Sequence, residues 1–272
     1  MTMLPDLSES ERRNLLEVER LNQRGGRTLS IVDLVAAGTL TAEMAALAWL
    51  LISDGASFLT GAVPGGAGKT TLMGALLSFL PPGEPVVTVG ERRVLDGALE
   101  GRLAAPATVL AHEIGAGRWF GYLWGRDAVD FFSLHCRGLR RVCCLHADAP
   151  EEARAALHGL GVSCEDFGHM ILQFFMRVHP GRRGPVRRVS AMHCLLGRKL
   201  RLLYRWDSER ERFAAALDRA ELSALVAGDR GRSPEQVAAR WGAYERCLEG
   251  LEGRGVRTLS DVRRGVLASY SG

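Results

Sequence analysis

The feature that most constrains this chain is the run from Val63 to Thr71, which reads VPGGAGKTT. An apolar stretch, 57–63, leads into it, and a segment with helical character, 70–79, follows. A glycine-rich loop between a buried strand and a helix is the setting that a Walker A loop requires. The sequence therefore predicts a phosphate-binding loop in a strand–loop–helix unit.

Each residue type in this loop suits a polyphosphate. Glycines let the backbone curl so that its N–H groups point inward at phosphate oxygens. Lys69 would bridge the β- and γ-phosphates, and the Thr70 hydroxyl would bind Mg²⁺. The predicted nucleotide-binding residues are Pro64, Gly65, Gly66, Ala67, Gly68, Lys69, Thr70 and Thr71, and the predicted metal ligand is Thr70.

The first position of the motif departs from the pattern, because Val63 stands where Walker A loops have a glycine. A β-branched residue tolerates a positive φ poorly, which counts against the motif. The alternative is a glycine-rich turn that only happens to contain Gly-Lys-Thr. The strand before the loop and the helix after it favour the phosphate loop.

The composition is that of a soluble globular protein, with 47% hydrophobic and 24% charged residues. The formal charge of +4 comes from arginine, since Lys69 and Lys199 are the only lysines. The basic run 182–188 could touch nucleic acid or lipid headgroups. A turn flanked by solvated charges explains this run more simply, so no nucleic-acid partner is expected.

The six cysteines show no metal-ligand spacing, and we interpret them as reduced core residues of a cytosolic protein. The N-terminus opens with a polar run rather than a signal peptide. The most apolar segment, 44–59, is interrupted by Ser53-Asp54-Gly55 and is too short to span a bilayer.

Hydrophobic periodicity predicts elements along the whole chain. We expect a charged helical arm over 8–24, and a buried helix over 42–52 capped by Thr41. Strands are expected at 57–63, 86–89, 108–111, 118–123 and 141–145, and helices at 70–79, 126–136 and from Pro150 onward. A hairpin should join 187–195 to 199–205. From Ser208 the pattern is purely helical, with caps at Ser233 and Ser260.

Strands that alternate with helices around such a loop indicate an α/β fold with a largely parallel sheet. The predicted units are an N-terminal helical arm over 1–28, a P-loop domain over 29–205 and a C-terminal helical bundle over 206–272. Trp119, Tyr122 and Trp124 alternate with other apolar residues, which favours a buried strand over a base-stacking platform.

With the loop placed, four other stretches carry a family resemblance. They are 30–44 before the loop, Val86–Glu91, Leu145–Ala149 with Gly125–Ala128 ahead of it, and the tail from Trp206 to Tyr270. In this order they resemble the ATPases of type II and type IV secretion, type IV pili and the archaellum motor, with a tail similar to the archaeal branch. Val86–Glu91 resembles the strand that enters the family's Asp box, and Leu145–Ala149 resembles its His box.

The resemblance implies a RecA-like ATPase core with a C-terminal helical bundle that uses ATP and Mg²⁺. It also implies a ring, hexameric in the family, formed with copies of the chain or with paralogous motor subunits. The expected partner is an inner-membrane platform protein, and the expected location is cytoplasmic, peripheral to the membrane. Nucleotide turnover would drive assembly of pili or protein secretion.

The chain departs from the family pattern at its catalytic positions. In the Asp box only Glu91 keeps a carboxylate, and the position of the expected water-activating glutamate falls on Val94. The Walker B glutamate falls on Tyr122 in the alignment that we prefer, because Gly125 fixes the register. An alternative alignment, with an insertion, uses Glu113.

His146 matches the His box and is a candidate sensor of the γ-phosphate; the alternative is a strand-end histidine bonded to the backbone. The candidate catalytic residues are therefore Glu91, His146 and Glu113. His112 precedes Glu113, but adjacent residues on a strand face opposite sides, so we interpret this pair as structural.

Two further parts of the family pattern are reduced. The arginine-bearing stretch shrinks to 115–118, and only the arm over 1–27 stands in place of the domain that covers the nucleotide. Together with the missing carboxylates, these losses predict a weak or inactive ATPase.

Two other functions remain open. The chain could be a non-hydrolysing structural or regulatory subunit of a hetero-oligomeric motor. It could also be an unrelated P-loop kinase or GTPase, although neither an arginine-rich lid nor an Asn-Lys-x-Asp guanine motif is visible.

Overall fold

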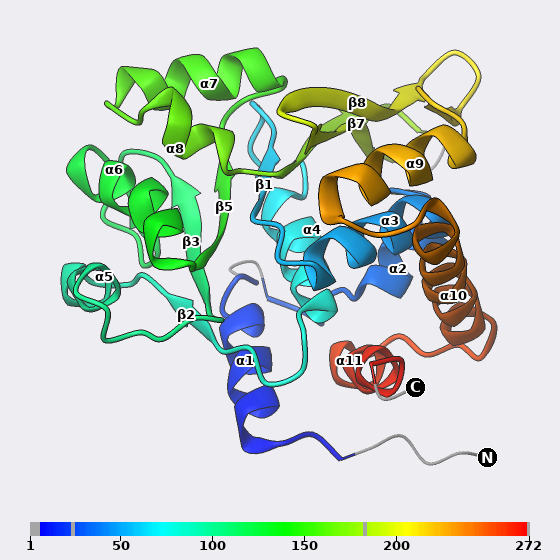
Figure 1. Ribbon diagram of the computed structural model, residues 1–272, viewed down its shortest axis with the longest axis horizontal. Helices are drawn as coiled ribbons and strands as arrows, with labels where there is room; N and C mark the ends of the chain where they lie inside the picture. The colour runs from blue at the N-terminus through cyan, green and yellow to red at the C-terminus, as the bar shows by residue number, and fades with distance from the viewer. Residues whose placement is uncertain (1–5, 23–24, 182–183, 271–272) are drawn as a thin grey trace.

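The computed structural model describes residues 6–22, 25–181 and 184–270. Within these ranges the strands form one nine-stranded sheet flanked by helices (Figure 1). The strands are β1 (Phe58–Gly61), β2 (Val86–Thr88), β3 (Thr108–Ile114), β4 (Tyr122–Leu123), β5 (Arg140–Leu145), β6 (Leu172–His179), β7 (Val186–Leu196), β8 (Lys199–Asp207) and β9 (Arg212–Ala215).

The helices before the C-terminal region are α1 (Glu9–Glu19), α2 (Ile31–Ala36), α3 (Ala42–Ser53), α4 (Lys69–Leu76), α5 (Arg92–Leu99), α6 (Arg126–Ser133), α7 (Pro150–Gly159) and α8 (Cys164–Gly168). The C-terminal helices are α9 (Arg219–Arg230), α10 (Pro234–Gly253) and α11 (Leu259–Ala268). Short 3-10 turns, η1 (Leu77–Phe79) and η2 (Leu134–Arg137), extend α4 and α6.

The strand order is β2-β3-β5-β1-β6-β7-β8-β9, and β4 pairs with β3 beyond the end of β2. Pairing is parallel from β2 to β6 and antiparallel from β6 to β9. The expected α/β fold with a mainly parallel sheet is therefore confirmed. Because parallel strands end at the same edge, the segments that follow β1, β3 and β5 come together there.

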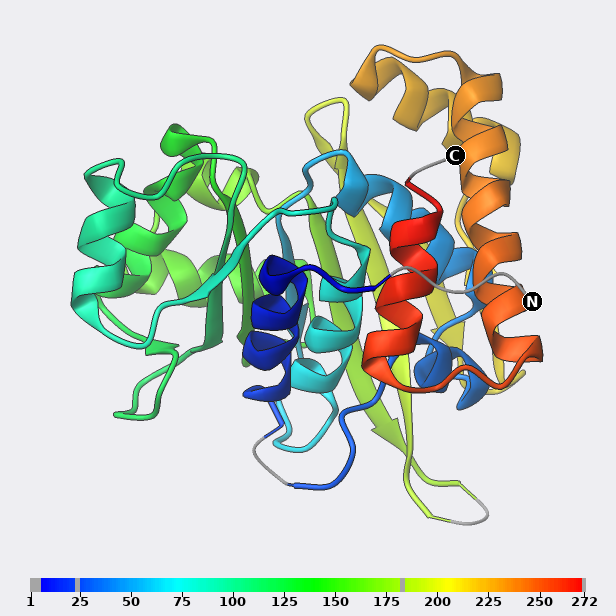
Figure 2. The same cartoon turned by 90° about the horizontal axis from the view of Figure 1, so that it is seen from below.

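Two apolar clusters cover the two faces of the sheet. One contains side chains of α3, α4, α10 and α11, with Trp49 stacked between Phe79 and Tyr244 at centroid distances of 5.1 and 4.0 Å. The other contains side chains of α5 to α8, such as Leu95, Phe131 and Leu157. Figure 2 shows these two groups of helices on opposite sides of the sheet.

Local signals predicted several elements correctly. Thr41 caps α3, and its side chain accepts a hydrogen bond from the Met44 amide. Residues 44–52 are all buried, as their apolar character around the whole helix requires. The β7–β8 hairpin turns at Gly197 and Arg198, both with positive φ.

The N-terminal helix α1 packs onto the body of the protein. The side chain of Asn14 pairs with the backbone at the start of β2. Its Nδ2 donates to the Glu84 carbonyl at 2.8 Å, and its Oδ1 accepts from the Val86 amide at 2.8 Å. Glu11 forms a buried ion pair with Arg263 of α11, with oxygen–nitrogen distances of 2.7 and 2.8 Å. Parts of the predicted arm, residues 1–5 and 23–24, lie outside the described residues.

The C-terminal region was predicted incorrectly in two places. It is not purely helical from Ser208, because β9 pairs with β8 before α9 begins at Arg219. The cap of α11 is Thr258 rather than Ser260, and it accepts from the Asp261 amide. Ser233 caps α10 as expected.

The predicted strand over 118–123 was also wrong. Only Tyr122 and Leu123 are extended, and Trp119 and Trp124 are 70% and 53% exposed. Glycines break the stretch: Gly121 has a φ of 77°, and a Cβ there would lie 2.6 Å from the His112 ring. The alternation of aromatic residues therefore reflects a surface turn, not a buried strand.

Burial of the cysteines is mixed. Cys143, Cys144 and Cys194 lie in the core, as expected, whereas Cys136 and Cys164 are exposed. Among the helices that the structure describes, none combines the length and apolarity needed to cross a bilayer. Residues 182 and 183 of the basic run lie outside the described part of the chain.

Candidate functional site

The glycine-rich loop joins β1 to α4 and curls at two glycines. Gly66 and Gly68 have φ values of 80° and 97°, a region that only glycine adopts freely. Leu72 N–H donates to the Gly68 carbonyl at 2.9 Å, so the first turn of α4 closes directly behind the loop. The free N–H groups and the positive end of the helix dipole therefore face the loop.

Val63 keeps an ordinary backbone conformation. Outside the glycines, only Arg198 and Glu211 have a positive φ in the described part of the chain. The Val63 amide donates to Asp148 Oδ1 at 2.8 Å, and its carbonyl accepts from His146 Nδ1 at 2.8 Å. The departure from the Walker A pattern at this position consequently introduces no backbone strain.

The side chain of Lys69 extends into a buried polar cluster formed by the Ala62 carbonyl, Glu113 and His146. Its Nζ donates to the Ala62 carbonyl at 3.2 Å and lies 3.6 Å from Glu113 Oε2. His146 Nδ1 is 3.4 Å away. Since this nitrogen donates its proton to the Val63 carbonyl, it offers no lone pair to Lys69 in that tautomer.

Glu113 stands near the end of β3, beside the loop. Both it and Lys69 are more than nine-tenths buried. Burial raises the pKa of Glu113 above its usual value, and the charges of Lys69 and His146 only partly oppose this. Its second oxygen, Oε1, is buried and makes no hydrogen bond within the described structure. An acceptor in this state is suited to a cation or a water molecule.

The residues present fit a Mg²⁺–nucleotide complex better than an isolated metal ion. Among the described residues, no group of three or more His, Cys, Asp or Glu side chains could hold a metal. Thr70 lines this cavity, so a magnesium ion held by its hydroxyl would depend on phosphate oxygens for its other ligands.

The other candidates from the sequence lie elsewhere. Glu91 is exposed at the start of α5, pairs with Arg93 at 2.7 Å and does not line the cavity. Tyr122 lines the cavity opposite Glu113 in the β3–β4 register but carries no carboxylate. Of the two aligned positions, both line the cavity, and Glu113 is the one that brings a carboxylate to the loop.

His112 and Glu113 face different surroundings, as expected for adjacent strand residues. His112 is buried against Phe120 and Gly121 and does not line the cavity. Burial, together with the charge of Arg20, lowers the pKa of His112 to about 4. The imidazole is therefore neutral at physiological pH and takes no part in the loop.

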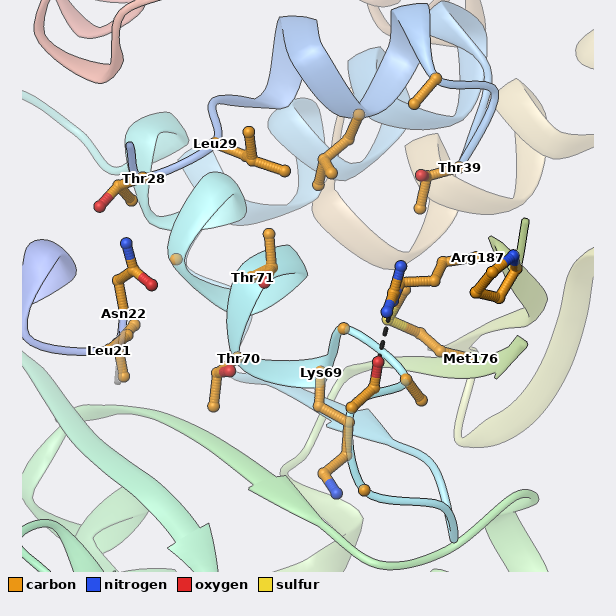
Figure 3. Close-up of a pocket in the computed structure, with 18 of the residues that line it drawn as sticks. Leu21, Asn22, Thr28, Leu29, Thr39, Lys69, Thr70, Thr71, Met176 and Arg187 are labelled. Carbon is orange, nitrogen blue, oxygen red and sulfur yellow. Dashed lines mark hydrogen bonds between the residues drawn. The ribbon is translucent and has the colours of Figure 1, made fainter. Parts of the chain in front are cut away.

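A cavity of about 660 Å³ opens in front of the loop (Figure 3). Its inner wall is formed by the loop, the first turn of α4 and Glu113. Its outer wall includes Leu21, Asn22, Thr28 and Leu29 from the segment that follows α1. Met176 and Arg187, from β6 and β7, close a third side.

The sequence did not reveal two of these walls. Arg187 is separated from Gly66 by 121 residues, and it belongs to a basic run that we interpreted as a solvated turn. The outer wall comes from the predicted arm, and nothing in its charged helical pattern indicates that it faces the loop. Both depend on tertiary contacts that local patterns do not record.

No family model matches this chain, and no curated protein matches it significantly. Solved structures similar to it include the VirB11 ATPase from the type IV secretion system of Brucella suis, in complex with sulphate. The two chains are 19% identical over 70% of this chain and 57% of that one, with a TM-score of 0.39.

The Legionella pneumophila ATPase DotB is 12% identical, over 86% of this chain and 65% of its own, with a TM-score of 0.41. The chain thus spans less than two thirds of the length of either protein.

Proposed function

We propose that this chain binds ATP with Mg²⁺ through the loop from Pro64 to Thr71. The observation that carries the proposal is the position of Lys69 and Glu113, 3.6 Å apart, behind a glycine loop at the head of α4. An ammonium, a hydroxyl and inward backbone N–H groups at a helix N-terminus together form a polyphosphate site.

Each side chain at this site would have a role that follows from its chemistry. Lys69 neutralises phosphate charge, and the Thr70 hydroxyl is placed to hold the metal. When bound, Mg²⁺ would withdraw charge from the phosphate oxygens. Glu113, with its raised pKa and free Oε1, can accept a proton from a water molecule or hold that water in place.

We further propose that the chain is a member of the secretion and pilus motor ATPases. The support is the order of the matching stretches around the loop, together with the parallel sheet that brings β1, β3 and β5 to one edge. In this role the chain would act in a ring with copies of itself or paralogous subunits. It would act on the cytoplasmic side of the membrane, against a platform protein, in pilus assembly or protein secretion.

Titration with labelled ATP and Mg²⁺ tests the binding proposal. Lys69→Ala should weaken binding by at least about tenfold, because it removes charge-assisted contacts to phosphate. The matched control is Lys199→Ala, which removes the other lysine of the chain from an exposed position on β8. An unmodified protein without saturable ATP binding, or equal affinities for the two variants, would refute the proposal.

A second candidate function is that of a subunit that binds nucleotide without turning it over. It is favoured by the position of Glu91, which is exposed and outside the cavity, and by Val94 at the expected base position. Steady-state phosphate release separates the two functions. Release that depends on Mg²⁺ supports an ATPase, whereas ATP binding without release supports the non-hydrolysing subunit.

A further inference from the structure

Arg187 reaches the phosphate loop from a distant part of the chain. It stands near the start of β7, and its Nε donates to the Gly66 carbonyl at 2.8 Å. A Cβ on Gly68 would lie 3.2 Å from Arg187 Cδ, so the side chain also lies close to the next part of the loop. Arg187 and Lys69 both line the cavity in front of the loop (Figure 3).

The other cations in the cavity wall are already engaged. Arg27 makes a two-pronged ion pair with Asp33 at 2.7 and 2.9 Å, and Lys69 lies beside Glu113. The Arg188 guanidinium donates to the Ala37 carbonyl at 3.0 Å and stacks over Trp206 at 5.1 Å. These groups are held by contacts away from the cavity or by an acid.

Arg187 differs from these cations because its two Nη groups make no hydrogen bond or ion pair in the part of the chain that the structure describes. No carboxylate lies within ion-pair distance of Arg187 in the described ranges, and only its Nε makes a side-chain hydrogen bond there. The two Nη groups therefore keep up to four N–H donors for a ligand. A guanidinium fork of this kind matches phosphate oxygens geometrically as well as by charge.

The strand that carries Arg187 is fixed in place. Val189 N–H donates to the Thr39 carbonyl at 2.8 Å, and Arg188 is bound to Ala37. On the other side β7 pairs with β6, where Arg187 lies opposite Val178. The backbone at Arg187 is thus held between β6 and the turn after α2, while its exposed side chain can move.

We propose that Arg187 is a further nucleotide-binding residue, which contacts the phosphates of the bound nucleotide in cis from β7. The proposal rests on the proposed ATP site. Arg187 would supply a cation to the cavity. The arginine-bearing stretch that the family resemblance places near the nucleotide is shortened here to 115–118. The alternative is a purely structural role, in which Arg187 only holds the loop through Gly66.

Affinities for Mg·ATP and Mg·ADP, measured for three variants, separate these roles. Arg187→Ala should weaken ATP binding by about tenfold or more and ADP binding by less, because a cation contributes more to the ligand with more charge. Arg187→Lys should recover part of the loss, since it keeps the charge. Arg205→Ala, an exposed arginine of β8 in the same meander, should behave as the unmodified protein.

Three outcomes would overturn the proposal. Equal losses for ATP and ADP, with no recovery in Arg187→Lys, would show that the residue only holds the loop. Unchanged affinity in Arg187→Ala, with a loss in Lys69→Ala, would exclude Arg187 and leave the ATP site intact. An unmodified protein that binds neither nucleotide would remove both proposals.

Discussion

Glu113 and Lys69 lie 3.6 Å apart, and both are more than nine-tenths buried. They come from different elements, the end of β3 and the first residue of α4, that the sheet order brings together. A buried carboxylate with one free oxygen is unfavourable for the fold unless something binds to it. We therefore take this pair as the centre of the site.

Glu113→Gln tests that centre, because it removes the charge and keeps the shape of the side chain. If the unmodified protein releases phosphate, Glu113→Gln should lower the rate by about 100-fold or more, since general-base groups contribute that much. Single-turnover assays with labelled ATP measure the rate. Glu91→Gln should leave the rate unchanged, because Glu91 does not line the cavity. A loss in Glu91→Gln alone would transfer the role to Glu91.

Glu11→Gln should destabilise the protein by about 3 kcal/mol at neutral pH, because it leaves Arg263 buried without its partner. Chemical denaturation at pH 7 measures this loss. Glu9→Gln, on the exposed side of the same helix, should change stability by less than about 0.5 kcal/mol. Similar losses in both variants would contradict the importance of the buried pair.

The effect of Glu11→Gln should also depend on pH. Burial alone would raise the pKa of Glu11, but hydrogen bonds and charge from Arg263 and the Gly83 amide outweigh burial, so the pKa lies below 4.5. A lowered folded pKa gives stability that is present above pH 4.5 and is lost as the pH falls through the folded value. The difference between the unmodified protein and the variant should therefore shrink below pH 4.5. A difference that is constant down to pH 3 would argue against this linkage.

Gly61→Ala should destabilise the protein by about 1–3 kcal/mol, as overpacking in a core does. A Cβ at Gly61 would lie 2.6 Å from the Ala147 carbonyl and 2.8 Å from the Phe175 ring. Thermal and urea unfolding measure the loss. Gly228→Ala in α9, where a Cβ meets no atom within 4 Å, should keep or increase stability. Equal stability of Gly61→Ala and the unmodified protein would be inconsistent with the tight approach of β1 to Ala147.

Gly90→Ala tests how the surface turn that carries Trp119 and Phe120 packs against the segment after β2. A Cβ at Gly90 would lie 2.0 Å from the Phe120 ring, so the ring must move. We expect the substitution to be destabilising alone and nearly neutral in a Phe120→Ala background. A double-mutant cycle should give a coupling of at least about 0.5 kcal/mol. The same loss in both backgrounds would mean that Phe120 does not pack on Gly90.

The sequence predicted the loop and its immediate surroundings well, because those signals are local. Thr41, the apolar residues of α3 and the glycines before Lys69 act within a few positions of one another, so their spacing carries the information. The same holds for the β7–β8 hairpin, whose turn is a single glycine–arginine pair.

The parts of the cavity that depend on tertiary contacts could not be predicted. The alignment counted back from Gly125 and so preferred Tyr122 over Glu113, but it could not show that both residues line the cavity. The contact between Arg187 and Gly66 spans 121 residues. The alternating aromatic residues around Trp119 have the spacing of a buried strand. The glycines of this stretch, such as Gly121 with its positive φ, make it a turn instead.

The ion pair between Glu11 and Arg263 has a consequence for the newly made chain. The carboxylate of Glu11 stays without its ion-pair partner until α11 has been synthesised, because Arg263 lies 252 residues further along. Before that point, the contacts of α1 with the β2 edge through Asn14 are available, but the Glu11 ion pair is not. The cavity wall that follows α1 would therefore reach its final place only once α11 is available to pack against that helix.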